Sequence, residues 1–329
     1  NQQEQKIARR AMSSKKENRS PASPMHGVAV AEQLPRPDIS PAMASKLVQH
    51  SEGAIWVKSD VVSFFGATIE TRMVVIRLQD GSLFVHSPTW LDEDVKTELA
   101  ALGTVKYVVS PNKIHNQCMA QWGEEFPDCR LYASPGLVER RPDVKFYATL
   151  GDEPEPEWAD EIDQAIVYGN SFFQEVLFFH KATGVLIVCD LIEYVTEDTL
   201  DRCGITGAKR WAVTAMMNAF YHGLCTGKPM PSPEFQIYTT DVDALKASIR
   251  KILPEKELTE KFAMKSKGKL VRPASGSPDS GSEVRHRGWE PQRILLCHGE
   301  LIDHDALTNL SKVFVELLNI ASNRGSLKK

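Results

Sequence analysis

The chain has 329 residues, of which 42% are hydrophobic and 25% charged, and its formal net charge at pH 7 is −4. This length is enough to bury a large core, in one large domain or two small ones. The charges of both signs are mixed along the chain, which excludes the concentrated basic face of a dedicated nucleic-acid-binding protein. We therefore expect no nucleic-acid partner.

Nothing in the sequence indicates a membrane protein or a disulfide-stabilised secreted domain. No apolar run approaches the roughly 20 residues that span a bilayer, and the N-terminus lacks the apolar core of a secretory signal. The six cysteines stand singly, without a Cys-x-x-Cys pair, which argues against a disulfide framework or a zinc ribbon. We expect reduced thiols, a cytoplasmic location and no membrane partner.

The N-terminal segment, residues 1–44, is rich in Lys, Arg, Ser, Pro and Gln and has almost no periodic apolar pattern. Such a composition cannot bury enough apolar surface to fold and predicts a disordered tail. Its Arg and Ser content loosely resembles an organelle transit sequence, but Glu4 and Glu17 weaken that alternative. The tail precedes a domain that we predict over residues 45–325.

The domain begins with strands and continues as a β-α-β unit. A hairpin turn at Gln79–Ser82 joins the last two of the first predicted strands, and a helix over Leu91–Leu102 ends at Gly103 before a strand over Val105–Ser110. The first predicted strands are residues 55–57, 73–78 and 83–86.

The middle of the chain is predicted to hold a helix from Pro111 through Trp122 and a strand over Arg130–Ala133. The stretch from Gly151 to Asp163 is strongly acidic, without a basic residue, and indicates a solvated loop.

A second hairpin is predicted from Gln174–Phe179 and Val185–Asp190, joined by a turn that ends at Gly184. This register places Glu175 opposite Asp190. His180 lies at the other end, five strand steps or ~16 Å away, beyond the reach of a metal ligand. Glu175 is thus a candidate catalytic neighbour of Asp190.

The C-terminal third predicts three helices and one flexible, polar insertion over residues 254–288, whose Lys, Gly and Ser runs have linker composition. The helices are expected at residues 211–221, 242–253 and 305–321.

Three apolar, strand-like segments run directly into polar residues that can bind a metal ion. The donors at their ends are His115, Asp190 and His298. Because strand ends meet at one edge of a layered α/β fold, we expect these three side chains to share one site. Singly, each also has an ordinary structural explanation, such as a capped turn or a hydrogen-bonded histidine.

His86 is a further candidate, because His86-Ser-Pro88 closes a strand at a loop that should open on the same edge. It could act as a ligand, as a hydrogen-bond partner of a ligand, or as a general base. The alternative is a hydrogen-bonded histidine that fixes the Ser-Pro turn.

Several of these segments together resemble the DUF4336 family, which is placed in the metallo-β-lactamase-like superfamily. The similarity spans roughly residues 50–195, and His298-Gly299 resembles the last metal-ligand motif of the superfamily. The resemblance implies an αββα sandwich of metallo-β-lactamase type, with metal at the sheet edge. The segments that carry it are residues 72–78, 86–88, 110–115, 158–163 and 179–191.

The resemblance also implies a His-x-His-x-Asp-His motif, which this chain keeps only in part. If His115 matches the last histidine, then Ser110, Asn112 and Ile114 stand where ligands are expected. The remaining set of His115, Asp190 and His298 would hold one Zn²⁺ or Fe²⁺ and leave positions open for water or substrate.

We therefore expect a metal-dependent hydrolase of a small ester, lactone or similar small-molecule substrate, with a single-metal site. A catalytically degenerate member that acts as a binding or scaffold protein is the main alternative, because several ligands are missing. An iron-dependent oxidoreductase with the same residues is a third. The sequence has no phosphate loop, nucleophile elbow or dinucleotide fingerprint.

Overall fold

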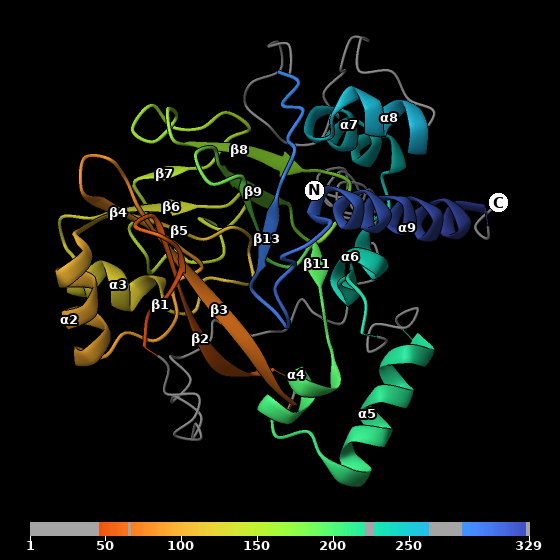
Figure 1. The fold of residues 1–329 in the computed structure, drawn as a ribbon, viewed down its shortest axis with the longest axis horizontal. Coiled ribbons are helices and arrows are strands. Elements are labelled where there is room, and N and C mark those ends of the chain that lie inside the picture. The colour runs from red at the N-terminus through yellow and green to blue at the C-terminus, as the bar shows by residue number, and fades with distance from the viewer. Residues whose placement is uncertain (1–45, 65–66, 221–226, 263–284, 327–329) are drawn as a thin grey trace, which may run out of the picture. The chain divides into compact units, whose positions relative to one another are not determined.

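The computed structural model describes residues 46–64, 67–220, 227–262 and 285–326 (Figure 1). All of them lie in one compact unit, Gln33–Lys329. The predicted N-terminal tail and residues 263–284 of the predicted insertion fall outside the described residues. Within the described part of the chain, no helix has the length and apolarity needed to cross a membrane.

The first sheet has seven strands in the spatial order β1 to β7. Neighbours are antiparallel from β1 to β4 and parallel from β4 to β7. The strands are β1 (Val48–Ser51), β2 (Ile55–Phe64), β3 (Ala67–Arg77), β4 (Ser82–His86), β5 (Thr104–Val109), β6 (Arg130–Ala133) and β7 (Ala148–Thr149).

The second sheet has four strands in the order β13-β10-β9-β8, with β10 parallel to β13 and antiparallel to β9. Its strands are β8 (Ile162–Val167), β9 (Glu175–His180), β10 (Val185–Val188) and β13 (Arg293–Leu296). A small two-stranded sheet pairs β11 (Ile192–Glu193) with β12 (Met230–Pro231).

The helices lie outside the two main sheets. Figure 1 shows α2 and α3 on the side of the seven-stranded sheet and α7, α8 and α9 on the side of the four-stranded one. The helices are α2 (Glu93–Leu102), α3 (Met119–Glu125), α4 (Glu197–Arg202), α5 (Gly207–Phe220), α6 (Pro233–Tyr238), α7 (Val242–Ile252), α8 (Glu255–Phe262) and α9 (Ala306–Ser326).

Strand alternation produces three apolar layers, because successive side chains point to opposite faces of a sheet. Between the sheets, the Phe84 ring meets those of Trp158 and Phe178 edge-on, with centroids 5.1 and 5.3 Å apart. Val85 faces the other way, into a layer with α2 and α3. Leu186 contributes to the third layer, with α6 to α9. The predicted αββα arrangement is therefore confirmed.

The ends of α2 follow the sequence signals. The Asp92 carboxylate accepts a hydrogen bond from Val95 N at 3.0 Å, and the amide of Gly103 donates to Leu99 O. A Cβ at Gly103 would lie 2.2 Å from Gly81 O, so only glycine fits where this helix passes the β3–β4 turn. The helix begins two residues later than predicted.

Two sequence predictions about polar segments need correction. The acidic stretch from Gly151 to Asp163 is not a simple solvated loop, because Asp152 is buried and forms an ion pair with Lys251 of α7. Its second half also carries the buried Trp158. The predicted insertion begins with the ordered helix α8, which packs through Leu258 into the outer layer.

The Asp152–Lys251 pair gives a test of the packing of α7 on β8. Lys251 also donates to Ile166 O at 2.8 Å and is 2% exposed. The substitution Lys251→Met removes the only cation of this pair and should lower the free energy of unfolding by about 3 kcal/mol, because Asp152 is left charged and buried. Urea unfolding measures the change.

The matched control is Lys246→Met on the same helix. Lys246 pairs with Asp243 at the surface, where an ion pair contributes ~0–1 kcal/mol. Equal losses in the two variants would contradict a structural role for the buried pair.

Candidate functional site

The three predicted donors meet at the ends of β5, β10 and β13. His115 Nε2 lies 3.0 Å from His298 Nε2 and 3.4 Å from an Asp190 carboxylate oxygen. His298 Nε2 lies 3.1 Å from the other Asp190 oxygen. Asp190 and His298 are buried and His115 nearly so. Side chains 75 or more positions apart in the sequence thus converge at one point, as the sequence predicts.

The loop that carries His115 is not the helix that the sequence predicts. Residues 111–118 form turns, and the helix begins only at Met119. The Asn112 side chain accepts hydrogen bonds from the amides of Ile114 (2.8 Å) and His115 (3.1 Å), and Ser110 Oγ donates to His115 O at 2.7 Å. Such Asx-type bonds compete with helix formation and hold the loop in a turn.

Asn112 also connects this loop to Asp190. Its amide nitrogen donates to an Asp190 oxygen at 2.6 Å and lies 3.4 Å from Glu175. Asn112 occupies a position where the resemblance predicts a metal ligand. In this structure it orients a candidate ligand instead.

Glu175 lies opposite the end of β10, as the hairpin register predicts. Its two oxygens accept hydrogen bonds from three consecutive backbone amides, those of Cys189 (2.8 Å), Asp190 (2.7 Å) and Leu191 (3.0 Å). Burial and the charge of Asp190 hold the pKa of Glu175 well above its ordinary value. The Glu175 carboxyl group therefore fixes the backbone that carries Asp190.

His298 is oriented by the hairpin of the other sheet. Its Nδ1 donates to Glu70 O at 2.7 Å, which directs Nε2 toward Asp190. Arg72 on the same strand donates to the carbonyl groups of Leu296 and Gly299, on either side of His298. A Cβ at Gly299 would lie 2.1 Å from Tyr194 O, and the residue has φ +77°, so glycine is required there.

His115 is oriented in a similar way. Its Nδ1 is hydrogen-bonded to Ser87 Oγ at 2.8 Å. Ser87 adopts φ +51°, which is uncommon for a residue with a side chain. The turn after β4 thus accepts an unfavourable backbone conformation at the residue that contacts His115.

The charges of the three donors stabilise one another. Burial alone would raise the pKa of Asp190, but His115 and His298 hold it well below its ordinary value. Burial lowers the pKa of His298, but the neighbouring Asp190 outweighs it and raises that pKa to about 10. Without a metal ion, the group is an aspartate paired with an imidazolium.

His86 is the candidate whose surroundings differ most from expectation. It is completely buried, and neither ring nitrogen has a hydrogen-bond partner among the described residues. Its ring meets that of Phe178 edge-on, with centroids 5.5 Å apart. The alternative of a histidine that fixes the turn through hydrogen bonds is therefore wrong. His180 lies at the far end of β9, where its Nδ1 meets Thr183 Oγ1 at 2.8 Å.

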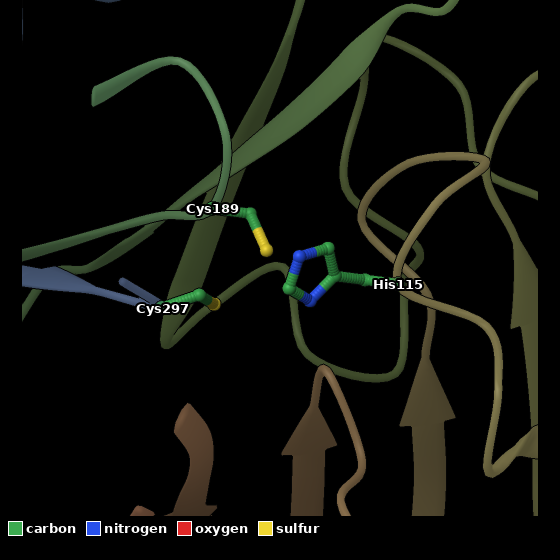
Figure 2. A group of neighbouring side chains, drawn as sticks. All are labelled: His115, Cys189 and Cys297. Atoms are coloured by element: carbon green, nitrogen blue, oxygen red, sulfur yellow. The ribbon is translucent and has the colours of Figure 1, made fainter. Parts of the chain in front are cut away.

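The sequence reasoning missed Cys189, Cys297 and Glu193. Donor atoms of the two thiols and of His115 lie within 4.8 Å of one another (Figure 2). Burial and the carboxylates of Glu234 and Asp190, against the opposing charge of His298, raise the pKa of Glu193 to about 8. Each cysteine directly precedes a predicted ligand, and that repeated position is the signal that could have revealed them.

The donor set of His115, Asp190 and His298 fits a divalent metal ion. The two histidine nitrogens lie 3.0 Å apart, and each lies 3.1 or 3.4 Å from one of the two Asp190 oxygens. These separations are close to the distance of about 3.3 Å between neighbouring ligand atoms in a tetrahedral site with ~2.0–2.1 Å ligand bonds. Each histidine has its other nitrogen hydrogen-bonded to an oxygen, which is the usual arrangement for metal-binding imidazoles.

Two facing sheets with helices outside and this His-Asp-His cluster at the strand ends define an αββα protein of the metallo-β-lactamase type. Residues 52–209 match the profile of the family described as "Domain of unknown function (DUF4336)", which confirms the family resemblance seen in the sequence. The matched range includes His115 and Asp190 and ends before His298.

Similar solved structures are metallo-β-lactamase-fold proteins of low sequence identity. The DIM-1 metallo-β-lactamase is 12% identical, with a TM-score of 0.48, over 84% of this chain and 97% of its own. The Pontibacter korlensis metallo-β-lactamase is 9% identical, with a TM-score of 0.45, over 82% and 98%. A putative diflavin flavoprotein fragment from Nostoc sp. is 9% identical, with a TM-score of 0.48, over 85% and 98%. No curated protein matches the chain.

The close approach at Gly299 predicts a local effect on His298. Gly299→Ala should destabilise the protein by at least about 2 kcal/mol more than Gly204→Ala, and should displace the adjacent His298. Gly204 has a similar φ of +67° but nothing within 4 Å of its Cβ position, so its substitution costs only about 1 kcal/mol of backbone strain. Urea unfolding of both variants checks this, and equal losses would contradict the contact with Tyr194.

The raised pKa of His298 predicts a pH-dependent contribution to stability. In the protein stripped of metal by a chelator, pairing with Asp190 stabilises the fold fully below the ordinary pKa of 6.5 and is lost as pH rises toward about 10. The gap in melting temperature between the parent protein and His298→Gln should therefore shrink from pH 6 to pH 10. The exposed His304 supplies the control, since the gap for His304→Gln should not change with pH.

Proposed function

We propose that this protein is a metal-dependent hydrolase of a small ester, lactone or similar substrate. In this proposal His115, Asp190 and His298 hold one Zn²⁺, or one Fe²⁺. The observation that carries the proposal is the cluster of three donor side chains: the two histidine Nε2 atoms lie 3.0 Å apart, and each lies 3.1–3.4 Å from one of the two Asp190 oxygens. Each side chain also has a hydrogen bond to a group outside the cluster.

A bound ion would lower the pKa of a coordinated water toward ~7 and supply a nucleophile. Side chains of the protein would position the metal ligands and transfer protons. Asn112 orients the Asp190 carboxylate and Glu175 fixes its backbone, so both are positioning residues. A single ion with three protein ligands leaves positions open for water and substrate.

Glu193 is the residue that we propose to move a proton. It is half-buried on β11, close enough to His298 and Asp190 for their charges to act on its carboxyl group. A carboxyl group with a pKa of about 8 exchanges protons readily near neutral pH, which suits a general acid or base. Glu175 does not suit this role, because both of its oxygens are already bound to backbone amides.

The alternative of a binding or scaffold protein has one specific observation in its favour. Ser110 and Asn112, which replace expected ligands, both have structural roles: Ser110 fixes the His115 loop and Asn112 fixes Asp190. A fold that keeps the cluster for stability alone would show the same bonds. Metal content separates the two functions.

The test compares the purified parent protein with His115→Ala and Asp190→Asn. The parent protein should bind about one equivalent of Zn²⁺ and hydrolyse 4-nitrophenyl acetate, and each variant should lose the ion and fall to the rate of the chelator-treated protein. His180→Ala, which removes a buried histidine far from the cluster, should keep both properties.

Plasma emission spectrometry measures the metal and far-ultraviolet circular dichroism checks folding. A parent protein that takes up no Zn²⁺ or Fe²⁺ after reconstitution would refute the proposal. So would folded ligand variants that hydrolyse the ester as fast as the parent protein.

A further inference from the structure

A second group of metal-binding side chains lies next to the cluster described above, on the inner side of the sheets. Val185 and Ile187 of β10 and Leu295 of β13 belong to the layer between the sheets. Because strand side chains alternate, the next inward positions are Cys189 and Cys297. Phe84 of β4 lies in the same layer, and the next inward position there is His86.

The parallel register of β10 and β13 brings the two thiols together. Val188 is paired with Leu296, and Cys297 N donates to Val188 O at 3.1 Å, so Cys189 and Cys297 are neighbours just beyond the paired residues. Both are completely buried and neither is in a disulfide. The apolar end of the sandwich thus carries two reduced sulfur donors side by side.

His115 completes a three-donor group with these thiols. One ring nitrogen of His115 and the two Sγ atoms all lie within 4.8 Å of one another. Figure 2 shows the Cys189 side chain pointing toward the His115 ring, with Cys297 alongside at the end of β13. The group is formed by the ends of two neighbouring strands of the four-stranded sheet and by the turn after β5.

His86 is an independent sign that this group lacks a partner. It is a buried side chain whose two ring nitrogens have no hydrogen bond of ordinary distance and angle in the described part of the chain, and it is close enough to Cys297 to lower the pKa of that thiol. Burying an imidazole without a hydrogen bond costs roughly 1–3 kcal/mol. A metal-bound Cys297 thiolate would give one nitrogen of His86 a hydrogen-bond acceptor.

We propose that Cys189, Cys297 and His115 form a second metal site that takes a thiophilic cation such as Zn²⁺ or Cu⁺, with His86 as a hydrogen-bond donor to the Cys297 thiolate. Two thiolates and one imidazole are donors that both ions prefer. Binding requires both thiols to lose their protons to the solvent, since the thiolate is the ligand. No change of oxidation state is involved.

This site is distinct from the one under Proposed function, because Asp190 and His298 take no part in it. The two sites share His115, whose Nδ1 is bound to Ser87 and whose Nε2 faces His298. Because Nε2 can bind only one ion, a cation at the thiols would compete with a cation at the first site for this ligand. A cation at the thiols would fix the ends of β10 and β13 relative to the turn after β5, which carries His115.

The experiment is a titration of the chelator-treated protein, kept reduced with a phosphine, with Co²⁺ alone. The parent protein should show thiolate-to-cobalt charge-transfer absorption in the near ultraviolet. Cys189→Ser and Cys297→Ser should each abolish it, and His86→Gln should weaken Co²⁺ binding by about 10–100-fold. Asp190→Asn should retain the absorption, because the carboxylate belongs only to the first site.

Cys129→Ser is the matched control, since this free thiol is half-buried and lies outside the group. Cobalt X-ray absorption of the parent protein provides a readout without any substitution, and should show two sulfur neighbours at about 2.3 Å. Circular dichroism confirms that each variant folds.

Cobalt bound without charge-transfer absorption and without sulfur neighbours would overturn this proposal and leave the hydrolase intact. Absorption that survives in folded Cys297→Ser would also overturn it. Absorption in a protein with no esterase activity would support the thiol site while the proposed function fails.

Discussion

The register between β10 and β13 is the constraint on which both groups of side chains depend. The two parallel strands end at the same level, with Val188 beside Leu296. Each strand continues with a cysteine and then with a candidate metal ligand, Asp190 or His298. Because side chains alternate along a strand, the two cysteines point inward between the sheets, and Asp190 and His298 lie at the edge. A shift of one residue in this pairing would exchange the two environments and leave Asp190 buried without a histidine.

The sheet edge is held in place by contacts that come from elsewhere in the fold. Glu175 of β9 binds the amides after β10, and Glu70 and Arg72 of β3 bind the loop after β13. The carboxylate of Glu70 also pairs with Arg202 of α4. Each of the two strand ends that carry donors is therefore fixed by hydrogen bonds from a neighbouring strand or from the facing sheet.

Much of this site could be predicted from the sequence because it depends on local patterns. Apolar strands ending in His115, Asp190 and His298 are visible as such, and the turn at Gly184 fixed Glu175 opposite Asp190. The loop before α3 was mistaken for a helix because its apolar spacing is helical, whereas the deciding bonds come from the side chains of Ser110 and Asn112. The pairing of Cys189 with Cys297 depends on a contact between strands more than a hundred residues apart, which no local pattern reveals.

Asn112 has a consequence for how this site can change. Its side chain serves two loops at once: one end holds the turn that presents His115, and the other holds the Asp190 carboxylate. A histidine restored at position 112 would regain a ligand of the fuller motif but would break both of these bonds in the same step. A ligand at this position is therefore gained only together with the loss of the bonds that order His115 and Asp190, and other side chains would have to replace those bonds.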